Sequence, residues 1–453
     1  MQRRLTRLAL AIPLVLALVG AGSDLTQIHP GTMSAPLAAN PTAGTSGTGF
    51  QGIARRAAEG SPSGSAGATG SPAATGSPRA SSTATATPTG AIASPPPAEG
   101  SGPSPILLYA QDWNGYSSSR STAAWQQAAV THQILVGSPG PVYGDMIGQL
   151  HAWNPELKVL AYDLGPYTVA GTSDYTTLMS EHPDYFARDA QGDLITLAAG
   201  NGSPAYPDNT LMDEGNPGWQ AFEAQRVASE ISTWGFDGAY VDSMGPGVVT
   251  GSTTGIPIDP STGQAYTQAE WMAAGGATLD AIRAAIGSKY LFSTGLVNGI
   301  DYQDYTYLMS DSTANGFQTD SWMRLADASL TAWPSPSLLA SDLAMVQSLQ
   351  AQGKAFFGWT KVWMSATPAQ VSAWNTYGLA AYLLVDNGVN DYYTFDSPFA
   401  SDRTTIFYPN ELAALGAPDG PFTLSDGVYS RNFQFGSVTI NTTTNVAAVD
   451  VTP

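Results

Sequence analysis

Short apolar runs recur along the chain from Ile106 onward, and stretches with helical periodicity separate most of them. The runs are nearly continuous rather than alternating, which is typical of parallel strands that are buried on both faces. We therefore predict eight strands, at 106–113, 133–137, 158–165, 238–244, 290–298, 316–323, 354–363 and 381–386.

The stretches between these runs carry helix start signals. Thr267 and Glu270 form a capping box in the sequence Thr-Gln-Ala-Glu. Thr367 and Pro368 have the order of an N-cap residue followed by a first-turn proline. These signals and the apolar stripes predict helices at 122–131, 145–153, 219–234, 267–286, 337–352 and 367–381.

Eight strand–helix units within roughly 250–300 residues predict an α/β fold of the TIM-barrel type, (β/α)8. The alternative is a doubly wound sheet, which usually has a Gly-rich phosphate turn after its first strand. Here the first strand runs into Gln111-Asp-Trp-Asn-Gly115, without that turn. Two long connections, 166–217 and 245–266, follow strands three and four, so we expect them at the C-terminal face of the barrel.

The ends of the chain differ from this body. Residues 1–25 combine three arginines with a short apolar segment and read as a secretory signal, the alternative being an uncleaved membrane anchor. Residues 26–104 are rich in Gly, Ser, Pro, Thr and Ala, which predicts a disordered linker. We expect the barrel at 105–417 and a small C-terminal β appendage at 418–453, in an extracellular or cell-wall-associated monomer with no membrane span after cleavage.

Composition narrows the chemistry. The chain has no Cys and four His, which excludes thiolate chemistry and disfavours a His-rich metal site. The net charge is −19, and residues 105–453 hold 11 basic and 33 acidic residues. A body this acidic repels phosphate backbones, so we expect no nucleic-acid partner. We also expect no cofactor and no metal.

Polar and aromatic residues stand at the predicted strand ends, where barrel enzymes build their sites. An acidic, aromatic and His-poor mouth suits glycoside hydrolysis, which needs two carboxylates and stacking surfaces. The expected catalytic pair is Asp242 and Asp320, and the expected substrate contacts are Asp112, Trp113, Tyr162, Asp163, Asn298, Trp322, Trp359, Lys361 and Asp386.

Asp242 is the sharpest candidate, because it follows the buried run of Gly235-Phe-Asp-Gly-Ala-Tyr-Val-Asp242 directly. Asp237 in the same motif reads as a structural turn residue. Asp320 ends Gly316-Phe-Gln-Thr-Asp320 and precedes Trp322, whose ring against a carboxyl would favour the neutral form of a proton donor. The alternative for Asp320 is a helix N-cap, and the alternative for Lys361 is a structural partner of Asp386.

Three motifs carry a family resemblance. They are Asp213-Glu-Gly-Asn-Pro-Gly-Trp-Gln with the Asp242 motif, His182-Pro-Asp-Tyr-Phe-Ala-Arg-Asp-Ala-Gln-Gly-Asp193, and Gly427-Val-Tyr-Ser-Arg-Asn-Phe-Gln-Phe-Gly-Ser-Val-Thr-Ile-Asn441. Over 106–441 the chain resembles glycosyl hydrolase-like family fifteen, which is related to endo-polygalactosaminidase and α-galactosidase type barrels. The resemblance implies a nucleophile at Asp242 and an acid/base at Asp320, where many relatives carry Glu.

Two functions follow from these patterns. The first is a secreted retaining glycoside hydrolase that acts on a polysaccharide or oligosaccharide. The alternative is a non-catalytic glycan-binding surface protein that keeps the barrel. A lyase or carbohydrate esterase is disfavoured, because the sequence lacks the His ligands and a Gly-x-Ser-x-Gly elbow. For retention the two carboxyl groups should stand about 5–5.5 Å apart.

Overall fold

The computed structural model describes residues 106–112, 120–200, 205–399, 402–404 and 408–452. The predicted signal segment, the predicted linker and Trp113 lie outside these residues. Eight parallel strands form one sheet in the order β1-β2-β3-β7-β10-β11-β12-β13. They are β1 (Tyr109–Asp112), β2 (Ile134–Gly137), β3 (Lys158–Asp163), β7 (Gly238–Val241), β10 (Tyr290–Leu296), β11 (Gly316–Thr319), β12 (Ala355–Lys361) and β13 (Tyr392–Asp396).

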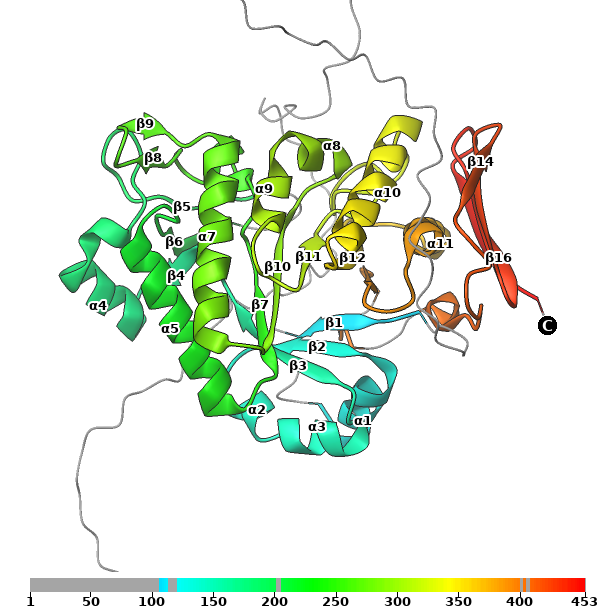
Figure 1. Cartoon of the computed structure of the whole chain (residues 1–453), viewed down its shortest axis with the longest axis horizontal. Coiled ribbons are helices and arrows are strands. Elements are labelled where there is room, and N and C mark those ends of the chain that lie inside the picture. The colour runs from blue at the N-terminus through cyan, green and yellow to red at the C-terminus, as the bar shows by residue number, and fades with distance from the viewer. Residues whose placement is uncertain (1–105, 113–119, 201–204, 400–401, 405–407, 453) are drawn as a thin grey trace, which may run out of the picture. The chain divides into compact units, whose positions relative to one another are not determined.

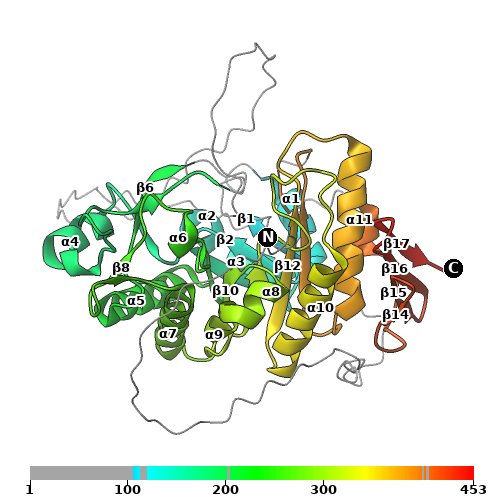
Figure 2. The same ribbon diagram turned by 90° about the horizontal axis from the view of Figure 1, so that it is seen from above.

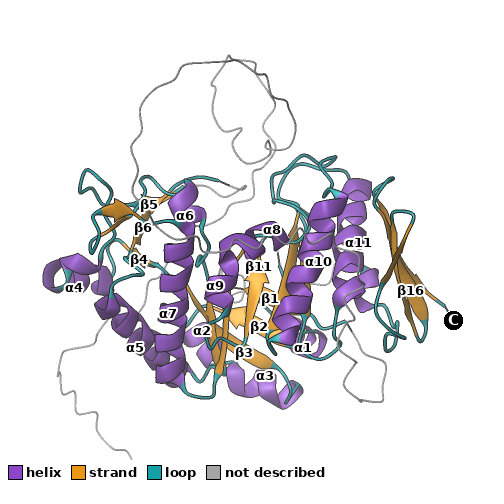
Figure 3. Ribbon diagram, turned by 45° about the horizontal axis from the view of Figure 1, so that its top comes forward, coloured by secondary structure: helices purple, strands orange, loops and turns teal. Residues whose placement is uncertain are grey.

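The first and last strands of this sheet meet, so the sheet closes into a barrel. Leu108 pairs in parallel with Tyr393, whose backbone N–H donates to the Leu107 carbonyl at 2.9 Å. Helices surround the strands on the outside (Figure 3). The predicted TIM barrel with its C-terminal β appendage is confirmed.

The helices lie between the strands as the start signals predict (Figure 1). Thr267 and Glu270 form the expected capping box on α7, and Thr367 with Gln370 forms a second one on α11. The α-helices are α1 (Thr122–Thr131), α2 (Pro141–Gly144), α3 (Ile147–Trp153), α4 (Ser173–Glu181), α5 (Pro217–Trp234), α6 (Gly247–Thr250), α7 (Gln268–Ile286), α8 (Gly299–Asp301), α9 (Tyr307–Ser310), α10 (Pro336–Ala351) and α11 (Pro368–Val385). The other helical segments are the 3-10 turns η2 (Pro183–Tyr185) and η4 (Pro409–Leu412) and the π-helical turn η3 (Tyr302–Thr306).

The predicted eighth strand is wrong. Residues 381–385 belong to the end of α11, Asp386 is its C-cap, and the eighth strand is β13, which begins at Tyr392. α11 packs against β12 and β13 on one side and against the C-terminal sheet on the other. Because two faces of this helix are buried, its sequence lacks the polar stripe of a surface helix and reads as a continuous apolar run.

The two long connections form an insert beside the barrel. Most of the first folds into α4 and a three-stranded antiparallel sheet of β4 (Tyr167–Val169), β6 (Tyr206–Leu211) and β5 (Thr196–Leu197). The second carries α6 and a hairpin of β8 (Ile258–Asp259) and β9 (Gln264–Ala265). A bridge between Leu197 and Thr253 joins the two connections. Both begin at carboxyl ends of barrel strands, as predicted.

Four antiparallel strands form the C-terminal sheet, which packs on α11 (Figures 1 and 2). They are β14 (Thr423–Ser425), β15 (Val428–Phe433), β16 (Gly436–Asn441) and β17 (Val446–Val451). The guanidinium of Arg431 donates to the carbonyls of Gly420, Leu383 and Asp386 at 2.8–2.9 Å. This buried side chain therefore links the sheet to the end of α11. Within the described residues, no helix is both long enough and apolar enough to cross a membrane.

Candidate active site

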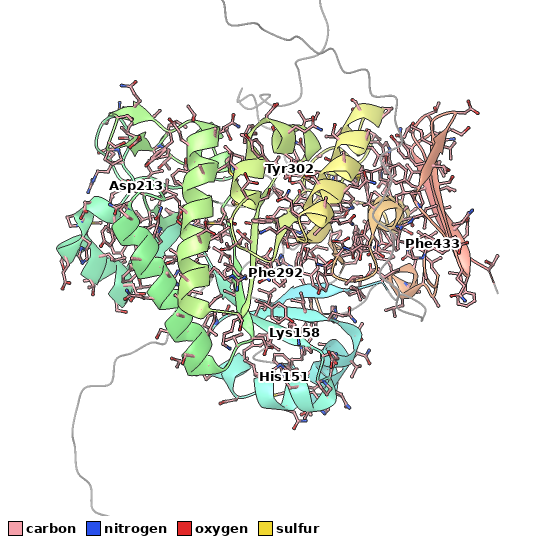
Figure 4. The ribbon with its side chains drawn as sticks, in the orientation of Figure 1. His151, Lys158, Asp213, Phe292, Tyr302 and Phe433 are labelled. Carbon is pink, nitrogen blue, oxygen red and sulfur yellow. The ribbon has the colours of Figure 1, made fainter. Side chains whose placement is uncertain are left out.

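Alternate positions of each strand supply the side chains inside the barrel, because neighbouring residues of a strand point to opposite faces. One buried cluster fills the interior, and Phe292, which Figure 4 labels, belongs to it. The other members are Tyr109, Ile134, Val136, Leu160, Tyr240, Ala355, Phe357 and Trp359. Two residues beyond Leu160, Tyr240 and Trp359 are Tyr162, Asp242 and Lys361. These three therefore form the next layer, toward the mouth of the barrel at the carboxyl ends of its strands.

Asp242 follows β7 directly and is held through both carboxylate oxygens. The Tyr162 hydroxyl donates to Oδ2 at 2.7 Å, and the Ser243 backbone N–H donates to Oδ1 at 2.7 Å. Ser243 has φ of +62°, a conformation that costs a non-glycine residue free energy and that recurs at functional sites. Burial and the charge of Asp320 raise the pKa of Asp242 to about 6.

The backbone at the end of β3 fixes the position of Asp242 along the barrel axis. The Asp242 N–H donates to the Asp163 carbonyl at 2.8 Å. Gly165 has φ of +66°, and a Cβ at this position would lie 2.0 Å from the Asp242 carbonyl oxygen. Only glycine fits here, because any side chain would push the end of β7 away.

Asp320 follows β11 directly, on the same side of that strand as the interior residue Gln318. Gln318 Nε2 donates to Asp320 Oδ1, and Lys361 Nζ forms an ion pair with Asp320 Oδ2 at 3.6 Å. The Asp320 side chain is 39% exposed, whereas that of Lys361 is 3% exposed. Asp320 is thus the more open of the two acidic candidates, with its carboxylate supported from within the barrel.

A hydrogen-bonded layer lies beneath both acids. Gln111 Nε2 donates to the Tyr240 hydroxyl at 2.7 Å and to Gln318 Oε1 at 2.9 Å. The Tyr109 hydroxyl donates to the same Gln318 oxygen at 2.7 Å. The layer thereby joins β1, β7 and β11 across the interior. It fixes the amide orientation of Gln318, so that its nitrogen points at Asp320.

Strands β12 and β13 bring a second group to the mouth. Lys361 Nζ lies 4.0 Å from the ring centre of Trp359 and 4.6 Å from that of Trp363. Asp396 Oδ2 accepts from Trp363 Nε1 at 2.6 Å and pairs with Arg403 Nε at 3.1 Å. The sequence reasoning missed Gln111, Asp396 and Arg403. For Asp396 a signal existed, since it ends the apolar run Tyr392-Tyr-Thr-Phe.

The profile of hypothetical glycosyl hydrolase family 15 matches residues 151–437, more than half of the chain. The chain belongs to this family. The predicted family and the predicted enzyme class are confirmed, and membership supports glycan cleavage as the activity. No curated protein matches the chain.

Solved structures of glycoside hydrolases resemble this family 15 chain. The glycoside hydrolase domain of PelA from Pseudomonas aeruginosa is 14% identical, with a TM-score of 0.40 over 65% of this chain and 95% of that one. An alpha-amylase from Lactobacillus plantarum is 13% identical, with a TM-score of 0.41 over 74% and 87% of the two chains. Aspergillus fumigatus Ega3, in complex with galactosamine, is 12% identical, with a TM-score of 0.38 over 68% and 95%. At these identities the similarity concerns the fold alone.

Two acids that were expected at the mouth of this family 15 barrel lie on its outer side. Asp112 neighbours the inward-facing Gln111, so its carboxylate points outward and accepts from Arg120 and from the Tyr143 hydroxyl, both at 2.8 Å. Asp163 neighbours Tyr162 and accepts from Arg226 of α5 at 2.7 Å. The pleat of the strands corrects both predictions, and each of these acids has an arginine partner instead.

Trp322 and Asn298 also serve the fold. Trp322 is 1% exposed, and its Nε1 donates to the Gly378 carbonyl of α11 at 2.9 Å. Its ring contacts Phe356 rather than the mouth, which corrects the prediction of a sugar platform beside Asp320. Asn298 is the N-cap of α8, since its Oδ1 accepts from the backbone N–H groups of Ile300 and Asp301.

Asp386 lies at the other end of the barrel. It caps the C-terminus of α11, whereas a strand end was expected. Its Oδ1 accepts from the Gly388 N–H at 2.9 Å and from the Tyr382 hydroxyl at 3.1 Å. The predicted substrate contact is therefore wrong. Lys361, for which pairing with Asp386 was the alternative to a substrate contact, pairs with Asp320.

Lys361 and Tyr162 do lie at the mouth, and Trp359 lies one layer below them. Trp359 is 4% exposed and Lys361 covers one of its faces, so this ring supports the lysine. Among the described residues, no group of three or more His, Cys, Asp or Glu has the geometry to hold a metal ion.

Proposed function

We propose that this chain is a retaining glycoside hydrolase, with Asp242 as nucleophile and Asp320 as acid/base. The observation that carries the proposal is that Asp242 at the end of β7 and Asp320 at the end of β11 both face the mouth, above the layer of Gln111, Tyr240 and Gln318 that joins the two strands. Two carboxylates at one mouth are what the reaction needs, because one attacks the sugar and the other transfers a proton.

In the first step, a carboxylate oxygen of Asp242 bonds to the anomeric carbon as the bond from that carbon to the leaving oxygen breaks. The proton of Asp320 passes to the leaving oxygen. In the second step, Asp320 takes a proton from water, the water oxygen bonds to the anomeric carbon, and Asp242 leaves as a carboxylate. The hydrogen bonds from Tyr162 and Ser243 fix the orientation of the attacking group.

Substrate contacts follow from what the mouth offers. Lys361 Nζ donates no hydrogen bond to a described residue, so its N–H groups are available to sugar hydroxyls. Trp363 and Tyr162 are half-buried, and aromatic faces stack on the C–H surfaces of sugars. The signal-like residues 1–25 support secretion, which N-terminal sequencing of the protein recovered from the culture medium would test.

The test uses the secreted full-length chain on a panel of microbial exopolysaccharides, with reducing ends as the readout. Asp242→Asn should lower turnover by at least about 1,000-fold while substrate binding persists. Asp320→Asn should slow natural substrates strongly and substrates with activated leaving groups least, because the latter need no proton. NMR should show a first-formed product with the anomeric configuration of the substrate.

Two results would contradict the proposal. If Asp242→Asn kept full activity, Asp242 could not be the nucleophile. If the first product had the inverted anomeric configuration, no covalent intermediate would form. Glycan binding without turnover in the parent protein would instead favour the non-catalytic surface protein.

A further inference from the structure

Lys361 holds a buried charge at the centre of the site. It is the last residue of β12, its side chain is 3% exposed, and its ammonium sits between the rings of Trp359 and Trp363. Among the described residues, its Nζ donates no hydrogen bond, and its one ion pair is with Asp320 at 3.6 Å. Burying an ammonium is costly unless it is closely paired, and the Asp320 contact is longer than a hydrogen bond, so the fold keeps this charge against a free-energy penalty.

The acidic residues around Lys361 differ in whether they have another cation as a partner. Asp396 has its own cation, because Arg403 Nε pairs with it at 3.1 Å and Trp363 donates to it. Within the part of the chain that the structure describes, Asp242 forms no ion pair and accepts hydrogen bonds from Tyr162 and Ser243. Lys361 interacts electrostatically with both candidate catalytic acids. The charged and titratable groups that face it or its partner acid are Tyr109, Tyr162, Tyr240, Asp242, Asp320, Asp396 and Arg403.

We propose that Lys361 is a positioning residue that stabilises the single negative charge of the two acids, on Asp242 when it attacks and on Asp320 once its proton has passed to the leaving oxygen. This inference rests on the proposed roles of the two acids. Without the lysine, that charge would have no nearby cation inside a buried site, where charges are weakly screened.

The effects of Asp320 and Lys361 on the pKa of Asp242 have the signs that the proposal requires. The carboxylate of Asp320 raises the pKa of Asp242, and Lys361 lowers it. A nucleophile must be ionised, so activity is lost as the pH falls through the pKa of Asp242. Loss of Lys361 raises that pKa further, and the acid limb of the pH profile then moves to higher pH.

The experiment compares pH profiles of kcat/KM in the full-length chain, on a substrate with an activated leaving group. Lys361→Met should shift the acid limb upward by about one pH unit. Lys361→Arg should stay close to the parent, since it keeps the charge. The matched control is Lys158→Met: Lys158 begins β3, at the opposite end of the barrel from the mouth, and lies over the Tyr290 ring at 5.5 Å (Figure 4). Its profile should not shift.

A second pair of variants keeps the test valid if Lys361→Met folds poorly. Asp320→Asn and Asp320→Asn/Lys361→Met lack the carboxylate, so the double variant leaves no unpaired Asp320 charge. The acid limb of the double variant should lie at higher pH than that of the single variant.

A rise in KM with an unmoved acid limb would overturn the inference and make Lys361 a substrate contact alone. This result would leave the proposed hydrolase intact. Failure of the proposed hydrolase function would be seen separately, as full activity of Asp242→Asn. That variant tests the chemistry independently of Lys361.

Discussion

The hydrogen bond from Tyr162 to Asp242 makes a quantitative prediction about acid sensitivity. Tyr162→Phe removes one donor from Oδ2, at 2.7 Å, and leaves the Ser243 N–H on the other oxygen. A hydrogen bond to a charged group contributes about 1.5–3 kcal/mol, and one pH unit corresponds to about 1.4 kcal/mol. The acid limb should therefore move upward by about one to two pH units.

The direction follows from the role of Asp242. Its pKa is already raised to about 6 by burial and by Asp320, and the Tyr162 hydrogen bond lowers it. Without that donor the protonated form persists to higher pH. At about pH 5 the variant should lose about tenfold or more in kcat/KM relative to the parent, whereas at about pH 8.5 the two should nearly agree.

The assay is kcat/KM against pH with an activated aryl glycoside, so that proton donation by Asp320 does not limit the rate. Tyr167→Phe is the matched control. The charge of Asp242 raises the pKa of Tyr167, yet among the described residues Tyr167 donates no hydrogen bond to it. If Tyr162→Phe lowered activity equally at all pH values, the hydrogen bond would not stabilise the ionised nucleophile, and the reasoning would fail.

Two further predictions concern stability. Arg431→Met should lower the free energy of unfolding by about 3 kcal/mol, since three carbonyls, two of them buried, lose their donor; urea denaturation measures this, and an unchanged midpoint would contradict it. Burial raises the pKa of Glu411 to about 8, so the folded state keeps a proton that the unfolded state releases near its ordinary pKa, and stability falls as the pH rises between them. In the parent protein the free energy of unfolding should therefore fall by about 2–3 kcal/mol more than in Glu411→Gln between about pH 5.5 and 7.5. Parallel curves of unfolding free energy against pH for the two proteins would contradict this reasoning.

The barrel could be predicted because seven of its strands are short apolar runs bounded by turns. The eighth could not, because α11 is buried on two faces and hides its helical period. The resulting shift in assignment placed Asp386 at the mouth and concealed Asp396. A strand that follows a doubly buried helix shows in the sequence only as a second apolar run, here Tyr392–Asp396.

The site could be predicted only as far as strand ends identify it. The position of a residue along a strand decides which end of the barrel it occupies. Because side chains alternate between the two faces of a strand, counting every second residue decides whether it faces the interior. Counting alternate residues from Tyr240 or Trp359 selects Asp242 and Lys361, and the same count on β1 selects Gln111 over Asp112. Contacts between strands, such as the bond of Gln111 to Gln318, depend on the closure of the barrel and lie beyond any local pattern.

The acids at the strand ends fall into two groups with different electrostatics. Those facing outward have arginine partners in direct contact, Arg120 for Asp112 and Arg226 for Asp163. Of the two acids proposed as the catalytic pair, Asp320 has an ion pair with Lys361 at 3.6 Å, and Asp242 accepts hydrogen bonds from Tyr162 and Ser243. A short hydrogen bond from a guanidinium favours the ionised form of a carboxylate, whereas burial without such a contact, as at Asp242, raises the pKa. This difference supports the proposed role of Asp242 and does not depend on any resemblance to known enzymes.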